Sequence, residues 1–250
     1  MKLIDKILAV EKDTIGMSAA TVYRCVVENT PVYLKEIDKI YAPTTYSVKR
    51  ESKMMQWLDG KINIPKVLEC GESQNTEYLI MSELPGETID NFSDKPEKFI
   101  SYYVKALKLL WNIDVKDCPF DSSVNMRLSE LRYLLDNNLA YTDGDDWEDS
   151  TSFESPEEFY NWLSSNKPDE ELVFSHGDIS NIYISDGEVY FFDLARCGKC
   201  DKYQDIALAV REIRHIYNNN REYEKMFFEM LDIIPDYKKL NYYLLLDEMF

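Results

Sequence analysis

The sequence is poor in glycine and proline and contains no long hydrophobic run. Its 250 residues include only 8 Gly and 9 Pro, so no long flexible linker is evident, and we find no internal repeat or low-complexity tract. No apolar stretch approaches the roughly 18 residues that a membrane-spanning helix needs. Asp5 and Lys6 interrupt the apolar residues near the start, which favours an amphipathic helix over a signal peptide. We therefore expect a cytoplasmic protein with no membrane segment.

Histidine and paired cysteines, the usual ligands of structural zinc, are also scarce. The chain has two histidines, His176 and His215, and its five cysteines are scattered along the sequence. Cys197 and Cys200 form a CxxC pair, but a zinc site would need a second such pair or two nearby histidines. An odd number of cysteines without a signal peptide favours free thiols over disulfides.

Basic residues are outnumbered by acidic ones. The chain has 28 Lys and Arg against 46 Asp and Glu, which gives a formal net charge of −18. This balance argues against binding to nucleic acid or to an anionic membrane, and it is compatible with a cationic ligand. Eight of the acids fall between residues 143 and 158, a stretch without Lys or Arg. That stretch is either a solvated loop or a docking surface for a polycation.

The hydrophobic pattern predicts a β-rich first third and a mostly helical remainder. Strand-like runs cover 21–27, 32–37, 64–68 and 78–81, and helical spacing covers 45–58. Helical spacing then covers 96–113 and 127–139, followed by strand-like runs at 172–175, 182–185 and 189–192 and by further helices from residue 202. Asp186-Gly187 is a strong hairpin signal. Residues 82–86 best separate a small β lobe from a larger helical lobe, so we predict an α+β fold.

Five polar side chains follow the order that kinase chemistry requires. Lys35 lies in a predicted strand and Glu51 in the predicted helix after it, while Asp178, Asn181 and Asp193 lie at the ends of short apolar strands. In kinases a lysine held by a glutamate grips the α- and β-phosphates, and an aspartate accepts the proton of the acceptor hydroxyl. An asparagine and a second aspartate hold Mg²⁺. The order therefore predicts a kinase, with Asp178 as the base and with Asn181 and Asp193 as metal ligands.

Longer motifs extend this pattern to a known family. They are VFSHGD at 173–178, DLARCGKCDKYQDIA at 193–207 and YYLLLDEMF at 242–250, with shorter matches at 13–18, 44–46, 54–58 and 65–67. These segments resemble the aminoglycoside 3′-phosphotransferases of the Gram-positive type, and the resemblance runs through nearly the whole chain. It implies a two-lobed, protein-kinase-like fold. It also implies phosphorylation of an aminoglycoside hydroxyl with ATP or GTP and Mg²⁺, which confers antibiotic resistance.

By this resemblance the chain divides into three parts. Residues 1–81 form a nucleotide-binding lobe, residues 82–86 a hinge, and residues 87–250 a helical lobe with the catalytic loop and the substrate site. The resemblance implies that Lys35 and Glu51 form the phosphate-gripping ion pair of the first part.

The resemblance also assigns further nucleotide contacts. It implies that Tyr33 stacks on the purine ring and that Ser82 and Leu84, at the hinge, offer backbone groups to the edge of that ring. Ser18 falls in the loop that covers the phosphates. None of these roles follows from the residue types alone.

An acidic acceptor site is implied as well. Arg196 matches a basic residue beside the substrate. The matching acids are Asp145, Asp146, Glu148, Glu248 and the terminal carboxylate of Phe250. Aminoglycosides are polycations rich in ammonium and hydroxyl groups, so charge-assisted hydrogen bonds to several carboxylates would bind them. Val10 and Gly144 stand where some relatives carry the cysteines of a covalent dimer, so we expect a monomer.

Three departures from the family pattern keep other functions open. Only two residues separate Asp178 from Asn181, where kinase loops typically have four, and the strand before Asp193 is one residue short. His215 stands where the family has an acid, and Glu212, one helical turn earlier, is the candidate substitute. The alternatives are a kinase of the same fold that acts on another alcohol, and a nucleotide- or antibiotic-binding homologue with impaired catalysis.

Overall fold

The structure is a computed structural model that describes residues 2–12, 19–142 and 153–250. The predicted site residues outside these ranges are Ser18, Asp145, Asp146 and Glu148. The chain forms two compact units: unit 1 comprises Met1–Thr88 and Asn181–Cys197, and unit 2 comprises Ile89–Ser180 and Gly198–Phe250. Residues Asn181–Cys197 thus group with the N-terminal strands. The functional division into lobes and a hinge at 82–86 stays a prediction.

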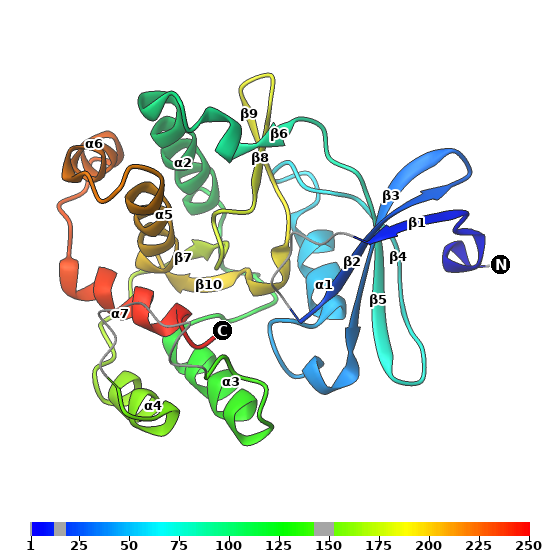
Figure 1. The fold of residues 1–250 in the computed structure, drawn as a ribbon, viewed down its shortest axis with the longest axis horizontal. Helices are drawn as coiled ribbons and strands as arrows, with labels where there is room; N and C mark the ends of the chain where they lie inside the picture. Colours follow the sequence, from blue (N-terminus) through cyan, green and yellow to red (C-terminus); the bar gives the residue numbers. More distant parts are fainter. Residues whose placement is uncertain (1, 13–18, 143–152) are drawn as a thin grey trace. The chain divides into compact units, whose positions relative to one another are not determined.

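A five-stranded antiparallel sheet forms the body of unit 1, in the strand order β1-β2-β3-β5-β4 (Figure 1). The strands are β1 (Ala9–Lys12), β2 (Thr21–Val27), β3 (Thr30–Asp38), β4 (Val67–Glu72) and β5 (Thr76–Ser82). Glu28 and Asn29, between β2 and β3, have φ of 50° and 67°, the left-handed conformation of a tight hairpin turn. The predicted hairpin is confirmed. β3 starts at Thr30, two residues earlier than predicted. Pro31 is tolerated there because it pairs with β2 and not with β5, so its missing N–H removes no hydrogen bond to β5.

Two segments of unit 1 differ from the prediction. The expected N-terminal amphipathic helix is only a 3-10 turn, η1 (Leu3–Lys6), whose apolar side chains pack against the sheet before β1 begins. β4 begins three residues later than the predicted run at 64–68, overlaps it at residues 67–68 and continues to Glu72. Pro65 has no N–H to donate, and β4 is an edge strand with polar residues, so its hydrophobic pattern is weak.

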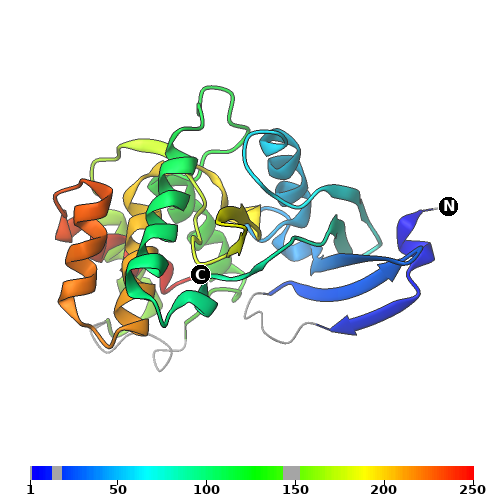
Figure 2. The same ribbon diagram turned by 90° about the horizontal axis from the view of Figure 1, so that it is seen from above.

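The two faces of the sheet are covered by different elements. The face under η1 carries a core cluster of Cys25, Val27, Val32, Leu34, Tyr78 and Ile80. Helix α1 (Val48–Leu58), light blue in Figures 1 and 2, packs against β3, β4 and β5 through buried Met54, Met55 and Leu58. Side chains alternate along a strand, so Lys35 points away from the cluster of Leu34 and toward α1.

A three-stranded antiparallel sheet completes unit 1. It contains β6 (Glu87–Thr88), β8 (Ile182–Ser185) and β9 (Glu188–Phe191). Asp186 and Gly187 have φ of 52° and 80°, so the predicted hairpin turn between β8 and β9 is confirmed. The 3-10 helix η4 (Leu194–Arg196) follows β9 and lies against α1. The hairpin therefore delivers Asp193 and η4 to the α1 face of the unit.

Helices form most of unit 2. They are α2 (Pro96–Trp111), α3 (Val124–Asp136), α4 (Pro156–Ser165), α5 (Tyr203–Ile216), α6 (Arg221–Leu231) and α7 (Tyr237–Asp247). Helix α5 contacts α2, α6 and α7 and is buried along its first eight residues (Figure 1). The antiparallel pair β7 (Leu172–Ser175) and β10 (Gly198–Asp201) lies beside these helices. This core positions the segment that follows β7.

Within the described ranges, no helix combines the length and apolarity needed to cross a membrane. The five cysteines are free thiols, as predicted. Cys197 and Cys200 are buried, and burial raises the pKa of Cys200 well above its ordinary value. The CxxC pair therefore carries no reactive thiolate at Cys200.

Candidate active site

Unit 1 holds a buried lysine between two carboxylates. Nζ of Lys35, in the middle of β3, lies 2.9 Å from Oε2 of Glu51 and 2.5 Å from Oδ1 of Asp193. Burial alone would lower the pKa of Lys35, but the ion pairs with Asp193 and Glu51 outweigh burial and raise the pKa above its ordinary value. Lys35 is therefore a fixed cation, the charge that a site needs to hold phosphate oxygens.

Asp193 has an uncommon backbone conformation. Its φ and ψ are 55° and 63°, in the left-handed region that residues with a Cβ rarely adopt. Oε1 of Glu51 accepts the N–H of Leu194 at 3.0 Å, and the N–H of Phe192 donates to the carbonyl of Asn181 at 3.1 Å. Asn181 thus lies beside the segment that leads to Asp193, despite its short spacing from Asp178. Strain of this kind is typical of functional sites.

The side chains of Asn181 and Asp193 fit the requirements of magnesium. Mg²⁺ is bound by oxygen ligands, usually one or two from side chains together with water and substrate phosphates. An amide oxygen and a carboxylate at the base of one hairpin are such a donor pair. The residues present therefore fit a nucleotide-bound magnesium ion.

Unit 2 presents Asp178 just after β7. Gly177, the residue before it, has a φ of 82°, which glycine adopts without steric cost. The N–H of Asp178 donates to Nδ1 of His176 at 3.3 Å, and Oδ1 of Asp178 accepts from Oγ of Ser180 at 2.8 Å. The carboxylate is oriented by these contacts and remains partly exposed. It is therefore suited to accept a proton from a hydroxyl group.

Asp205, in the first turn of α5, supports this segment, and the sequence analysis missed its role. Its carboxylate oxygens accept the N–H groups of His176 and Gly177, both at 2.8 Å. Burial raises the pKa of Asp205, while the interaction with the imidazole of His176 and the two N–H groups oppose that rise. A buried N–H without an acceptor costs about 1–3 kcal/mol, so Asp205 stabilises the backbone beside Asp178. The only signal was its place in the motif DKYQDIA.

A group of carboxylates also shares one neighbourhood in unit 2. Burial raises the pKa of Glu212 on α5, Arg211 opposes the rise, and the charges of Asp178 and Asp90 raise it further. Charges shift one another's pKa in this way only at short range. Asp90 lies in the 3-10 helix η3 (Ile89–Phe92), and nothing in its local sequence marked it. The predicted Glu212 thus lies near Asp178, with Asp90 as a further acid.

The other predicted acceptor residues of unit 2 lie at helix ends. His215 is in the last turn of α5, and its charge lowers the pKa of Glu212. Glu248 directly follows α7. The ring of Phe250 lies 3.6 Å from the guanidinium carbon of buried Arg127. Residues 248–250 are therefore attached to the body of unit 2.

Comparison with known proteins identifies the family. No family model matches the chain. An aminoglycoside 3′-phosphotransferase from Campylobacter jejuni is 54% identical to it, with both chains covered over 100% of their length. The chain belongs to the aminoglycoside 3′-phosphotransferase family. Proteins of the same name from Enterococcus faecalis and Staphylococcus aureus are 48% and 46% identical, over 100% of this chain and 96% of each relative. The family predicted from the motifs is confirmed.

Solved structures confirm the fold that is expected for an aminoglycoside phosphotransferase. An aminoglycoside 3′-phosphotransferase of type VIII has a TM-score of 0.77 at 23% identity, over 96% of this chain and 93% of that chain. An aminoglycoside phosphotransferase from Streptomyces rimosus, in complex with ADP and streptomycin, has a TM-score of 0.76 at 22% identity, over 96% and 91%. The predicted α+β, two-lobed, protein-kinase-like fold is therefore confirmed.

The residues that this phosphotransferase family would place at the purine lie near one another in unit 1. Tyr33 of β3 is next to Val32, which pairs with Ser82 at the end of β5. Oγ of Ser82 accepts a hydrogen bond from the N–H of Lys66 at 2.9 Å, so the end of β5 is bonded to the segment before β4. Leu84 follows two residues later and is half-buried. The structure therefore places Tyr33 opposite Met81, the residue next to Ser82, on two paired strands.

Arg196, which the resemblance predicted beside the substrate, contacts Tyr46 within unit 1. Nη2 of Arg196 lies 3.4 Å from the hydroxyl of Tyr46, and its guanidinium carbon is 5.6 Å from the ring centroid. Tyr46 ends the TTY motif that contributed to the resemblance. This contact gives the motif tyrosine a structural role, which is to orient Arg196.

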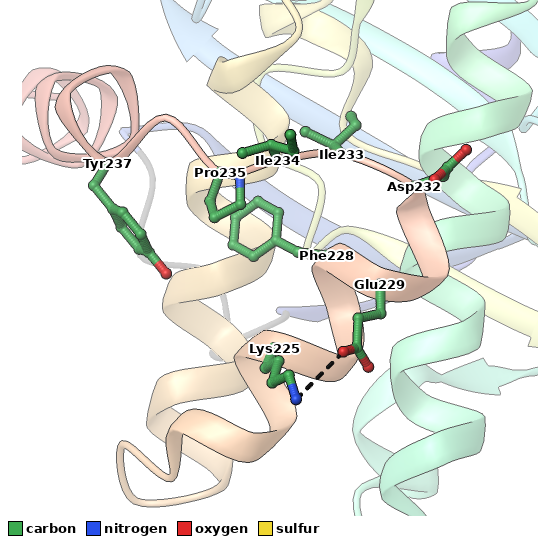
Figure 3. A pocket seen from close by; sticks show the side chains of 8 residues that line it. All are labelled: Lys225, Phe228, Glu229, Asp232, Ile233, Ile234, Pro235 and Tyr237. Carbon is green, nitrogen blue, oxygen red and sulfur yellow. Dashed lines mark ion pairs between the residues drawn. The ribbon is translucent and has the colours of Figure 1, made fainter.

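A separate surface hollow of about 440 Å³ lies where α6 leads into α7 (Figure 3). Its lining residues are Lys225, Phe228, Glu229, Asp232, Ile233, Ile234, Pro235 and Tyr237. Lys225 and Glu229 form an ion pair of 3.4 Å beside it. None of the predicted catalytic, nucleotide or acceptor residues of the phosphotransferase lines this hollow, so it is distinct from the candidate active site.

Proposed function

We propose that the chain catalyses the ATP-dependent phosphorylation of the 3′-hydroxyl of aminoglycoside antibiotics and thereby confers resistance. The observation that carries this proposal is the buried Lys35 bound to both Glu51 and Asp193. A fixed cation beside a carboxylate of metal-binding type grips and neutralises the phosphates of a nucleotide. The names of the full-length relatives indicate the acceptor.

In this proposal, residues of unit 1 bind the nucleotide. Lys35 contacts the α- and β-phosphates, Tyr33 stacks on the purine, and Ser82 and Leu84 offer backbone groups to the purine edge. Ser18, outside the described residues, would lie over the phosphates. The ADP bound to the Streptomyces rimosus relative supports a purine nucleotide. A stacked tyrosine accepts either ATP or GTP.

Asn181 and Asp193 would hold Mg²⁺ on the nucleotide. Held by these two side chains, Mg²⁺ would supply positive charge that stabilises the phosphates during transfer. The support from this chain is the donor chemistry of the two side chains and their place at the base of the β8–β9 hairpin. Lys35 and Glu51 keep Asp193 oriented, because Lys35 pairs with its carboxylate and Glu51 binds the next N–H.

Asp178 is the proposed base. Its carboxylate would orient the acceptor hydroxyl and take its proton. The new bond from the acceptor oxygen to the γ-phosphorus forms as the bond from that phosphorus to the ADP oxygen breaks. Ser180 fixes the carboxylate by hydrogen bonding, and Asp205 fixes the backbone before it. The products are ADP and a phosphate monoester of the antibiotic.

Carboxylates of unit 2 would bind the ammonium groups of the acceptor. Glu212 and Asp90 are supported by the charge effects that raise the pKa of Glu212, to which Asp178 and Asp90 both contribute. The further proposed contacts are Asp145, Asp146, Glu148, Arg196, His215, Glu248 and the carboxylate of Phe250. The streptomycin in the Streptomyces rimosus relative supports a polycationic acceptor. The proposal describes a cytoplasmic monomer that binds neither nucleic acid nor membranes, in keeping with its charge of −18.

The test is an ADP-release assay with Mg²⁺-ATP, with and without kanamycin. We expect kanamycin-dependent ADP release and a phosphorylated product by mass spectrometry, while a 3′-deoxy analogue of kanamycin releases none. Turnover confined to another alcohol would instead identify a kinase of the same fold with a different acceptor. Binding of ATP and kanamycin without turnover would identify an impaired homologue.

The raised pKa of Glu212 predicts a pH dependence of acceptor binding. Because its folded pKa lies above the ordinary value of 4.5, Glu212 gains a proton at higher pH than a free glutamate and then loses its attraction for ammonium groups. The KM for kanamycin should therefore rise as the pH falls through that raised pKa. A hydrogen bond to a charged group contributes about 1.5–3 kcal/mol, so Glu212→Gln should raise this KM about 10- to 100-fold at neutral pH.

The measurement is the KM for kanamycin from about pH 5 to about pH 8, for wild type, Glu212→Gln and Glu222→Gln. Glu222 is an exposed acid of α6 and serves as the matched control, with an expected wild-type profile. Glu212→Gln should show a weaker rise of KM toward acid pH. A Glu212→Gln profile that matches wild type would remove Glu212 from the acceptor site.

A further inference from the structure

Two adjacent residues of α1 bind the backbone that follows Asp193. Glu51 accepts the N–H of Leu194 through Oε1 at 3.0 Å. Arg50 donates from Nε to the carbonyl of Ala195 at 2.8 Å and from Nη2 to the carbonyl of Cys197 at 3.2 Å. All of these residues belong to unit 1. Three backbone positions downstream of Asp193 are therefore held by side chains of one helix.

The segment needs such external support because its own hydrogen bonding is sparse. It is a 3-10 turn of three residues, η4, closed by the N–H of Cys197 on the carbonyl of Leu194 at 3.2 Å. It begins directly after Asp193, whose backbone is left-handed. A short turn that starts from a strained residue relaxes unless surrounding groups hold it. Arg50 and Glu51 are the groups from α1 that hold it.

Arginine is suited to this task in a way that lysine is not. Its guanidinium presents N–H groups in a rigid planar fork, so one side chain reaches two carbonyls in fixed directions. Arg50 is itself well anchored, since it lies in the first turn of α1, where Oγ of Ser47 accepts its N–H at 3.3 Å. Because Arg50 is fixed to the helix, its hydrogen bonds fix the carbonyls of Ala195 and Cys197 relative to α1.

We propose that Arg50 is a positioning residue for phosphotransfer. Its guanidinium fixes the backbone from Asp193 to Cys197 and thereby aims the carboxylate of Asp193 at nucleotide-bound Mg²⁺. This inference rests on the proposed function and deepens it. Lys35 and Glu51 hold the carboxylate and the first N–H of the segment, and Arg50 holds the carbonyls beyond them. Loss of Arg50 would then weaken metal binding while Lys35 still grips the phosphates.

The test compares Arg50→Met and Arg50→Lys with Lys53→Met, an exposed position of the same helix. The first readout is the affinity for AMP-PNP with and without Mg²⁺, measured by calorimetry. In wild type and Lys53→Met, Mg²⁺ should tighten AMP-PNP binding. In Arg50→Met the Mg²⁺-free affinity should be kept and the gain from Mg²⁺ should fall about 10- to 100-fold, the usual effect of removing a group that orients a metal ligand. Arg50→Lys should restore only part of the gain.

The second readout is hydrogen exchange of the backbone amides from 194 to 198, which should be faster in Arg50→Met and unchanged in Lys53→Met. The proposal is overturned if folded Arg50→Met matches Lys53→Met in both readouts. Neither readout uses kanamycin. A wild type without kanamycin-dependent turnover would thus contradict the proposed acceptor, whereas the Mg²⁺-dependent binding comparison would still decide the role of Arg50.

Discussion

Asp178→Ala is expected to lower kcat about 10²- to 10⁴-fold, the range for loss of a general base, while the affinity for AMP-PNP stays near the wild-type value. The reason is geometric. The carboxylate of Asp178 is oriented by Ser180, and its backbone follows two N–H groups that Asp205 holds. The residues proposed for the nucleotide belong to unit 1, so removing a carboxylate from unit 2 should affect the chemical step rather than nucleotide binding.

The measurement is steady-state turnover with kanamycin, together with AMP-PNP binding by calorimetry. Asp169→Ala, at an exposed acid of the same unit, is the control and should keep wild-type kcat. Asp178→Asn preserves the size of the side chain and should lose nearly as much turnover, because an amide does not accept the proton. Wild-type-like turnover by Asp178→Ala would remove Asp178 as the base.

Lys35→Met is expected to lower the free energy of unfolding by about 3–5 kcal/mol, the usual effect of removing one partner of a buried ion pair. Glu51 has a side-chain exposure of only 1%, so the substitution leaves a buried carboxylate without its cation. Nucleotide affinity should fall as well, by about 10- to 100-fold, because a charged hydrogen bond to phosphate is lost. Urea unfolding and AMP-PNP binding measure the two effects.

The stability deficit of Lys35→Met should shrink as the pH falls. Burial raises the pKa of Glu51, and Lys35 opposes that rise. Without Lys35, Glu51 takes up a proton at higher pH in the folded state than in the unfolded state, so acid favours the folded variant. The double variant Lys35→Met/Glu51→Gln should regain part of the stability at neutral pH, whereas Lys12→Met, at an exposed position of β1, should lose little. A deficit independent of pH and of Glu51 would contradict this account.

Local elements of the fold were predictable where a short stretch of chain carries its own signal. Glu28-Asn29 and Asp186-Gly187 form the hairpin turns that were expected between strand-like runs, and Asn, Asp and Gly tolerate the positive φ of such turns. Helix α4 was missed although it has a local start signal, since Oγ of Ser155 accepts the N–H of Glu158 at 3.2 Å. That signal lies within the acidic stretch between residues 143 and 158. β10 was missed because it is a short strand whose partner, β7, lies far away in the sequence.

In the candidate site, too, the residue types were predictable from the sequence, whereas the contacts between distant residues were not. The order of Lys35, Glu51, Asp178 and Asp193 was visible in the chain and pointed to a kinase. The supporting contacts were not visible, because their partners are distant: Arg50 and Ala195 are 145 residues apart, and Asp205 and His176 are 29 apart. An arginine on a helix or an aspartate in its first turn is an ordinary surface residue by every local measure.

By itself, the sequence determined which chemical groups this phosphotransferase has and in what order, since residue types, motifs and turn signals are local properties of the chain. Only the tertiary structure decided which groups meet. In the tertiary structure Lys35 forms ion pairs with both Glu51 and Asp193. Asp205 accepts hydrogen bonds from the backbone before Asp178, and the charge of Asp90 acts on Glu212. The physical reason is that burial and hydrogen bonding between distant segments depend on how strands and helices pack, and such packing leaves no periodic trace in the residues that it brings together.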